Sequence, residues 1–233
     1  MFPFEDDPEP TGEKNTLGVI DGALTSLALA AIALVPTVLS AVFWPRALAP
    51  MIAAVEPQGR RGLLLAPGAF FVLGLITSSV AFAALAPNSG GTFVAIGSGV
   101  GTAASDGQVW AIATLFLPLF FVALFMGLVF HLPLFLMRVG DWPLVASIRA
   151  GFYAMVGFAM VLAPLEVFAL LMLSGTTPLV RELTVLVAIG LFGVWFFFSI
   201  QNEAQTPFAQ RLAASAFPAG VIPFAMSFGY SLA

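Results

Sequence analysis

The sequence contains no cysteine, and charged residues make up only 9% of its 233 positions. Without cysteine, the chain forms no disulfide, has no thiolate to ligate a metal and carries no cysteine-linked lipid. A typical soluble domain has about 25% charged residues, so this composition excludes a water-soluble domain of this size. The eight basic residues form no cluster larger than Arg60 and Arg61. Nucleic acids, which require a basic surface, are therefore excluded as partners.

Histidine is nearly absent, since His131 is the only one. This excludes a haem held by two histidines of the chain and a zinc ion held by three. One alternative is that His131 alone ligates a haem or a chlorophyll-type pigment, but a lone histidine near a helix end is more often a structural hydrogen-bonding residue. No acid of the flanking apolar stretches reaches its depth, so no serine–histidine–acid set is expected. We predict no cofactor, no metal site and no enzymatic activity.

What the chain has in abundance is apolar sequence: 60% of its residues are hydrophobic, and they gather in six long stretches. Each stretch has at least 18 residues, and only His131 and Glu166 in them ionise near neutral pH. A helix needs about 20 apolar residues to cross the hydrocarbon core of a bilayer. The sequence therefore predicts an all-α fold, a polytopic transmembrane helical bundle with five to six spans. The stretches are residues 22–44, 63–85, 109–137, 150–173, 183–200 and 212–233.

The chain divides into two parts. Residues 22–233 are expected to form a single transmembrane helical domain, because the connections between the stretches are too short for a separate soluble domain. Residues 1–21 are expected to form an acidic disordered tail, because acids and prolines concentrate there. The acids of the first 13 residues are Glu5, Asp6, Asp7, Glu9 and Glu13, and the prolines are Pro3, Pro8 and Pro10.

The positions of the arginines predict the orientation of the bundle. Arg181 is the only arginine in an even-numbered connection, so the positive-inside rule places the odd-numbered connections in the cytoplasm. The count does not decide whether residues 22–44 span the membrane or lie in its interface, because the other five spans keep their orientation in both cases. Pro36 would kink a helix in that stretch. The arginines of the odd-numbered connections are Arg46, Arg60, Arg61, Arg138, Arg149 and Arg211.

Glu166 is the strongest candidate for a functional residue. A carboxylate inside an apolar stretch costs a few kcal/mol to insert, so it is expected to face protein or water. It serves either as a proton or cation site, or as a neutral acid hydrogen-bonded to a carbonyl that Pro164 leaves free. Counted from the cytoplasmic arginines, His131 lies about 10 Å deep and Glu166 about 25 Å deep. We therefore expect no direct contact between these two residues.

Two further patterns concern packing. Small residues between positions 146 and 157, among them Gly151 and Gly157, favour the close approach of helices or self-association. Phe192 and the run of phenylalanines at 196–198 crowd one end of the fifth stretch. These aromatic side chains are expected to face lipid.

Four segments follow one another in an order that is typical of a known family. Residues 44–50, followed by Arg60 and Arg61, look like a proline-containing amphipathic lead-in to a first core span. Residues 141–154 look like a short cytoplasmic segment that runs into an Arg-x-x-x-Tyr-Ala helix start at Arg149. Residues 194–198 look like the aromatic end of a penultimate span, and residues 210–218 like the basic, alanine-rich start of the last span.

In this order the segments resemble the Yip family, multi-pass membrane proteins named for their interaction with small Ypt/Rab GTPases, and especially its bacterial type. The resemblance implies five core spans, a cytoplasmic N-terminus and a non-cytoplasmic C-terminus. The chain lacks the Asp-Leu-Tyr-Gly-Pro motif of the eukaryotic members. For bacterial relatives, the family implies a membrane location and no settled activity.

From these observations we expect a non-enzymatic integral protein of the inner membrane that acts as a scaffold or as an accessory or assembly subunit. Its expected partners are the lipid bilayer and either other membrane proteins or a second copy of the chain. The alternative is a small-solute or proton-coupled transporter or channel that uses Glu166.

Overall fold

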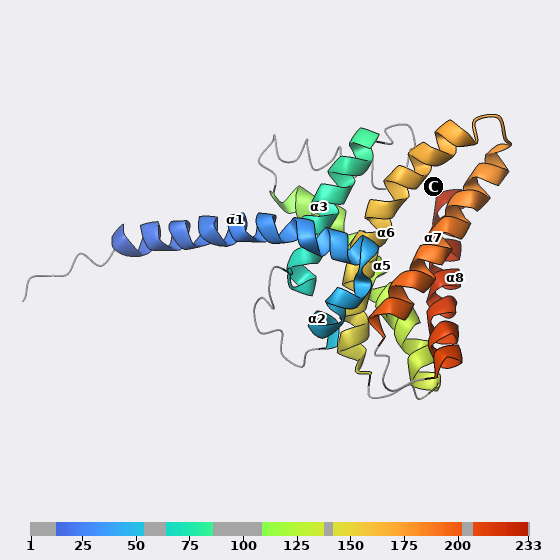
Figure 1. Ribbon diagram of the computed structural model, residues 1–233. Coiled ribbons are helices and arrows are strands. Elements are labelled where there is room, and N and C mark those ends of the chain that lie inside the picture. Colours follow the sequence, from blue (N-terminus) through green and yellow to red (C-terminus); the bar gives the residue numbers. More distant parts are fainter. Residues whose placement is uncertain (1–12, 54–63, 86–108, 138–141, 202–206, 233) are drawn as a thin grey trace, which may run out of the picture.

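The computed structural model describes residues 13–53, 64–85, 109–137, 142–201 and 207–232, and within them every regular element is a helix (Figure 1). The chain begins with α1 (Glu13–Phe43), a short 3-10 helix η1 (Pro45–Leu48) and α2 (Ala49–Ala53). The longer helices that follow are α3 (Pro67–Leu85), α5 (Val109–Leu136), α6 (Leu144–Met172), α7 (Pro178–Ile200) and α8 (Phe208–Leu232).

Four of the described helices are long and apolar enough to cross a membrane: α3, the Leu117–Leu136 part of α5, α6 and α7. The last apolar stretch forms α8, which has 25 residues and packs along α7 and α5. The prediction of an all-α membrane bundle is therefore confirmed. Proline lies inside α1, α5 and α6 at Pro36, Pro118, Pro133 and Pro164, as membrane helices tolerate.

The first helix differs from the others in length and direction. α1 has 31 residues, from Glu13 to Phe43, and so contains nearly all of the apolar stretch 22–44. In Figure 1, α1 lies across the other helices, and its N-terminal part extends to the left beyond them. This geometry favours the alternative in which the stretch 22–44 does not span the membrane.

α1 begins at Glu13, inside the segment 1–21 that the sequence predicts to be disordered. No proline lies between Pro10 and Pro36, so nothing stops the helix from continuing in the N-terminal direction past the apolar stretch. α1 therefore includes residues 13–21 of the predicted tail, residues 1–12 lie outside the described part of the chain, and the disordered tail stays a prediction.

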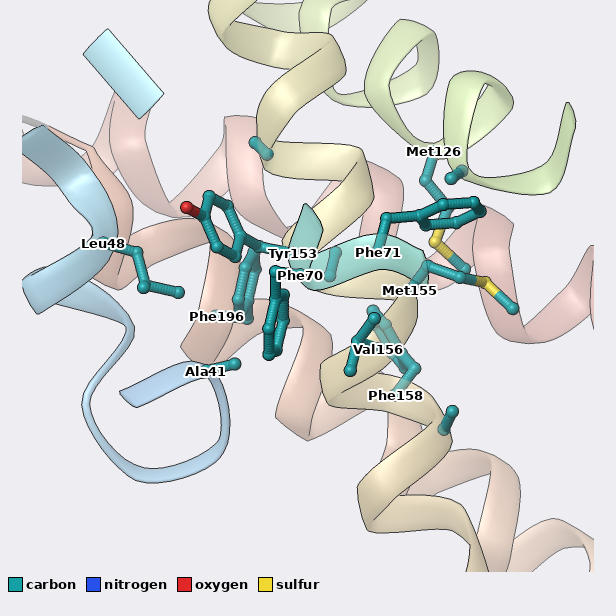
Figure 2. Packing of buried hydrophobic residues seen from close by; sticks show 14 of the residues in the cluster. Ala41, Leu48, Phe70, Phe71, Met126, Tyr153, Met155, Val156, Phe158 and Phe196 are labelled. Atoms are coloured by element: carbon teal, nitrogen blue, oxygen red, sulfur yellow. The ribbon is translucent and has the colours of Figure 1, made fainter. Parts of the chain in front are cut away.

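α6 is the central helix and packs against α1, α3, α5 and α7. Every residue from Tyr153 to Ala159 is buried, as expected for a helix that is surrounded on all sides. Figure 2 shows how Phe70 and Phe71 of α3, Met126 of α5 and Phe196 of α7 gather around this segment.

Glycines set the crossing of α5 and α6. A Cβ atom on Gly151 would overlap the carbonyl oxygen of Ala123, and one on Gly127 would lie 2.8 Å from the carbonyl oxygen of Ser147. The two backbones therefore touch directly. The prediction that small residues of α6 allow close helix packing is confirmed at Gly151.

The aromatic end of α7 corrects a prediction. Phe196 and Phe197 are fully buried, so the expectation that they face lipid is wrong. The Phe197 ring stacks on Phe130 of α5 with 4.6 Å between centroids, and Gly193 on the same face of α7 admits Phe158 of α6. Large rings here fill the space that small residues leave between helices.

Candidate functional site

A group of buried hydrogen bonds joins α6 to the segment that leads into α3. The Tyr153 hydroxyl donates to the carbonyl oxygen of Leu65 at 2.6 Å. The Leu65 N–H donates to Thr37 Oγ1 of α1 at 2.9 Å, and that hydroxyl donates to the carbonyl of Ala33 at 2.6 Å. Both backbone groups of Leu65, which precedes α3, are thus satisfied by side chains, as backbone in an apolar medium requires.

Arg149, which lies one helical turn before Tyr153 on α6, belongs to the same group of polar contacts. Its Nη1 donates to the carbonyl oxygen of Ile52 in α2 at 3.3 Å, a group that the short helix leaves without an internal partner. Arg149 and Tyr153 therefore hold α2 and the start of α3 against α6. We call Thr37, Ile52, Leu65, Arg149 and Tyr153 the lead-in cluster.

His131 has a structural partner on the neighbouring helix. Its Nδ1 lies 3.1 Å from the Oγ of Ser147, which is fully buried, and its ring stacks on Phe135. The bond joins the end of α5 to the start of α6. In the part of the chain that the structure describes, no three histidine, aspartate or glutamate side chains gather where they could hold a metal ion.

Glu166 lies far from His131. It is 19 residues beyond Ser147 on the same helix, or about 28 Å at 1.5 Å per residue. The prediction that the two residues do not meet is confirmed. Glu166 is half-buried near the end of α6, and its charge interacts attractively with Arg181 and repulsively with Glu182 in the first turns of α7. The carboxylate thus sits beside the α6–α7 connection rather than in the middle of the bundle.

A second polar group, which the sequence reasoning missed, surrounds Arg211 at the start of α8. Arg211 is only 7% exposed, and its Nη2 donates to the carbonyls of Phe198 at 3.1 Å and Gln201 at 3.4 Å. Its guanidinium lies 4.3 Å from the centre of the Phe198 ring. Arg211 thereby caps the carbonyl end of α7, where a cation is favoured. Gln201 and Ser215 complete the group through a 2.8 Å hydrogen bond.

Arg211 also lines a cavity of about 320 Å³, which we call the arginine pocket. The pocket lies where the end of α1 and η1 meet the end of α7 and the start of α8. Arg46 and Arg211 were predicted only as arginines of odd-numbered connections, on the cytoplasmic side. The sequence feature that could have indicated this pocket is that Arg46 and Arg211 both lie in odd-numbered connections, which the positive-inside rule places on the same side of the membrane. The lining residues are Phe43, Trp44, Pro45, Arg46, Trp195, Phe198, Ser199 and Arg211.

No protein-family model, curated protein or solved structure matches this chain. The resemblance to the Yip family therefore stays a prediction. Of the residues that suggest it, Arg149 and Tyr153 belong to the lead-in cluster and Arg211 lines the arginine pocket.

Proposed function

We propose that this protein is a non-enzymatic scaffold or accessory subunit of the inner membrane, bound to other membrane proteins or to a second copy of itself. The observation that carries the proposal is the geometry of α1. Its C-terminal half is fixed to the bundle, and the helix continues beyond the other helices (Figure 1). A helix anchored in this way presents surface to a partner.

The described half of α1 has two faces. Ala33, Thr37 and Ala41, spaced four residues apart, are buried against the bundle. The opposite face is apolar and exposed, and it lies along a stripe of three- and four-residue steps, as on one side of a helix. In the described structure this stripe is available to lipid or to a membrane protein. Its residues are Leu29, Ile32, Val35, Leu39 and Phe43.

The polar groups inside the bundle support a structural role. His131 binds Ser147, Tyr153 binds Leu65, and Arg149 binds Ile52. Each of these bonds joins two elements of the bundle. Polar residues in membrane bundles often act in this way as contacts between helices.

The transporter alternative draws no support from the position of Glu166. A coupling site is expected near the bilayer midplane, whereas Glu166 lies six residues before the end of α6 and interacts with Arg181. Transport through Glu166 stays a prediction, and its test is given below.

The scaffold proposal is tested by site-specific photo-crosslinking in intact membranes. A benzophenone side chain at Ile32, on the exposed stripe, is expected to yield a defined protein adduct. The matched control is Leu191 of α7, which is 66% exposed and lies on a different helix. Adducts to lipid alone from both positions, together with a monodisperse monomer in mild detergent, would contradict the proposal.

A further inference from the structure

The arginine pocket contains a buried cation without a matching anion. Arg211 is 7% exposed, and its Nε has no hydrogen-bond partner. The carbonyls of Phe198 and Gln201 and the Phe198 ring offset part of its charge. Within the described residues, however, no carboxylate pairs with Arg211. A buried guanidinium is costly unless an anion compensates it, so the site as described has an excess of positive charge.

A second arginine, Arg46, lines the same cavity. Arg46 belongs to η1, whereas Arg211 belongs to α8, so two separate elements bring cations to one space. An anion bound in this cavity would be attracted by both positive charges. Arginine is also the residue best suited to phosphate, because its planar fork donates two hydrogen bonds at once.

The walls of the pocket identify the kind of anion. Phe43, Trp44 and Trp195 line it, and all three are more than half exposed. Tryptophan is enriched where a membrane protein meets the headgroup region. Both arginines lie in connections that the positive-inside rule places in the cytoplasm. A soluble anion needs no exposed aromatic wall, whereas a lipid needs a cationic end and an apolar side.

We propose that the arginine pocket binds the phosphate headgroup of an anionic glycerophospholipid from the cytoplasmic leaflet. Arg46 and Arg211 bind the phosphate, and the glycerol and the start of the acyl chains lie along Phe43, Trp44 and Trp195. The volume of about 320 Å³ is at the lower end of the range for ligand sites, which suits a headgroup whose chains remain in the bilayer. Basic pockets between membrane helices are known to hold anionic headgroups in this manner.

The test is native mass spectrometry of the full-length protein released from micelles that contain equal amounts of phosphatidylglycerol and phosphatidylcholine. We expect retention of phosphatidylglycerol in preference to phosphatidylcholine. Arg46→Gln should lower the affinity for phosphatidylglycerol about ten-fold or more, because one charged hydrogen-bond donor is lost. Arg211→Lys keeps the charge but loses the fork, and should also weaken binding. Arg181→Gln, outside the pocket, should bind as the native chain does.

Several results would overturn the proposal. Equal retention of the two lipids, or native affinity in both Arg46→Gln and Arg211→Lys, would remove it. Displacement of the lipid by millimolar inorganic phosphate would assign the pocket to a soluble anion instead. Glu203→Gln changes an acid in the segment between α7 and α8, outside the described residues, and should have no effect. A gain in lipid binding by this variant would show that the chain supplies its own anion. If Arg211→Lys does not fold, the affinity of Arg46→Gln for phosphatidylglycerol decides: native affinity in that variant would overturn the proposal.

Discussion

The hydroxyl oxygen of Tyr153 lies 2.6 Å from the carbonyl oxygen of Leu65, and this bond joins the central helix to a residue 88 positions earlier in the chain. The Leu65 N–H is held by Thr37, so α1, α3 and α6 meet at one backbone unit. Aromatic packing supports the bond, since the rings of Phe70 and Tyr153 lie 5.3 Å apart. This junction fixes the α1 end of the bundle relative to its centre.

Tyr153→Phe removes one hydroxyl and leaves the Leu65 carbonyl buried without a partner. We expect the free energy of unfolding to fall by about 1–3 kcal/mol, the cost of an unsatisfied buried acceptor. Equilibrium unfolding in mixed micelles with increasing SDS measures this change. Thr184→Ala is the control, because it deletes a hydroxyl whose 2.8 Å bond to Val180 is exposed. Equal stability of Tyr153→Phe and the native chain would show that the junction contributes little.

Gly151→Ala is expected to separate α5 from α6, because the new Cβ atom would overlap the Ala123 carbonyl oxygen. Overpacking of this kind costs about 1–3 kcal/mol. Gly220→Ala in α8 is the matched control, since nothing lies within 4 Å of a Cβ there. Alanine should be neutral or stabilising at that helical position by up to about 1 kcal/mol. Unfolding curves of the two variants that coincide would contradict the close crossing.

His131→Ala should lower stability by about 0.6–1 kcal/mol, the typical value of a hydrogen bond between membrane helices. We expect the purified native protein and this variant to be equally colourless in visible light, where a bound haem or pigment would absorb. Absorption spectra of both proteins provide the check. A visible band in the native protein that His131→Ala abolishes would establish a bound pigment and revise the structural role assigned here.

Glu166→Gln tests the transporter alternative directly. Because Glu166 lies near the end of α6, six residues before Met172, we expect no difference in proton flux between proteoliposomes with the native protein and those with the variant. A pH-sensitive dye trapped in the vesicles reports the flux under an imposed gradient. Flux above that of protein-free vesicles, abolished in Glu166→Gln but retained in Glu182→Gln, would support transport instead of a scaffold role.

The N-terminus should lie on the cytoplasmic side of the membrane. This follows if α1, which lies across the other helices in Figure 1, does not cross the bilayer. Green fluorescent protein, which fluoresces only when it folds in the cytoplasm, should be bright at the N-terminus and dark at the C-terminus. An alkaline phosphatase fusion should give the opposite pattern. Two dark termini would show that α1 crosses and that the bundle has six spans.

The long helices could be predicted because the thickness of a bilayer imposes a length on every span. α3, α6 and α7 end within a few residues of the stretches that the sequence contains. The faces of these helices could not be predicted. In a helix that is apolar all round, the sequence does not distinguish lipid from protein, and Phe196 and Phe197 therefore proved to be buried.

The two polar sites differ in how far the sequence revealed them. Arg149 and Tyr153 are one helical turn apart and belong to a short motif that the sequence analysis named, but their bonds to Ile52 and Leu65 were not predicted. The arginine pocket depends on Arg46 and Arg211, which are far apart in the chain and are brought together only by the packing of η1 against α7. Glu166 drew attention as a charge in apolar sequence, yet its neighbour Arg181 belongs to the next helix. Such contacts between helices follow from tertiary packing, which no local pattern encodes.

The way α1 docks has a consequence for biogenesis. α1 leaves the ribosome before α6, but the surface it packs on belongs largely to α6, where Ala41 lies beside Gly157. At about 5–20 residues per second, the ribosome needs several seconds to make the intervening chain. During that interval α1 lacks the surface on which it packs, so its apolar side chains must be covered by the insertion machinery or by the membrane surface. α1 therefore reaches its final packing only after α6, a later segment of the chain, has been synthesised and inserted.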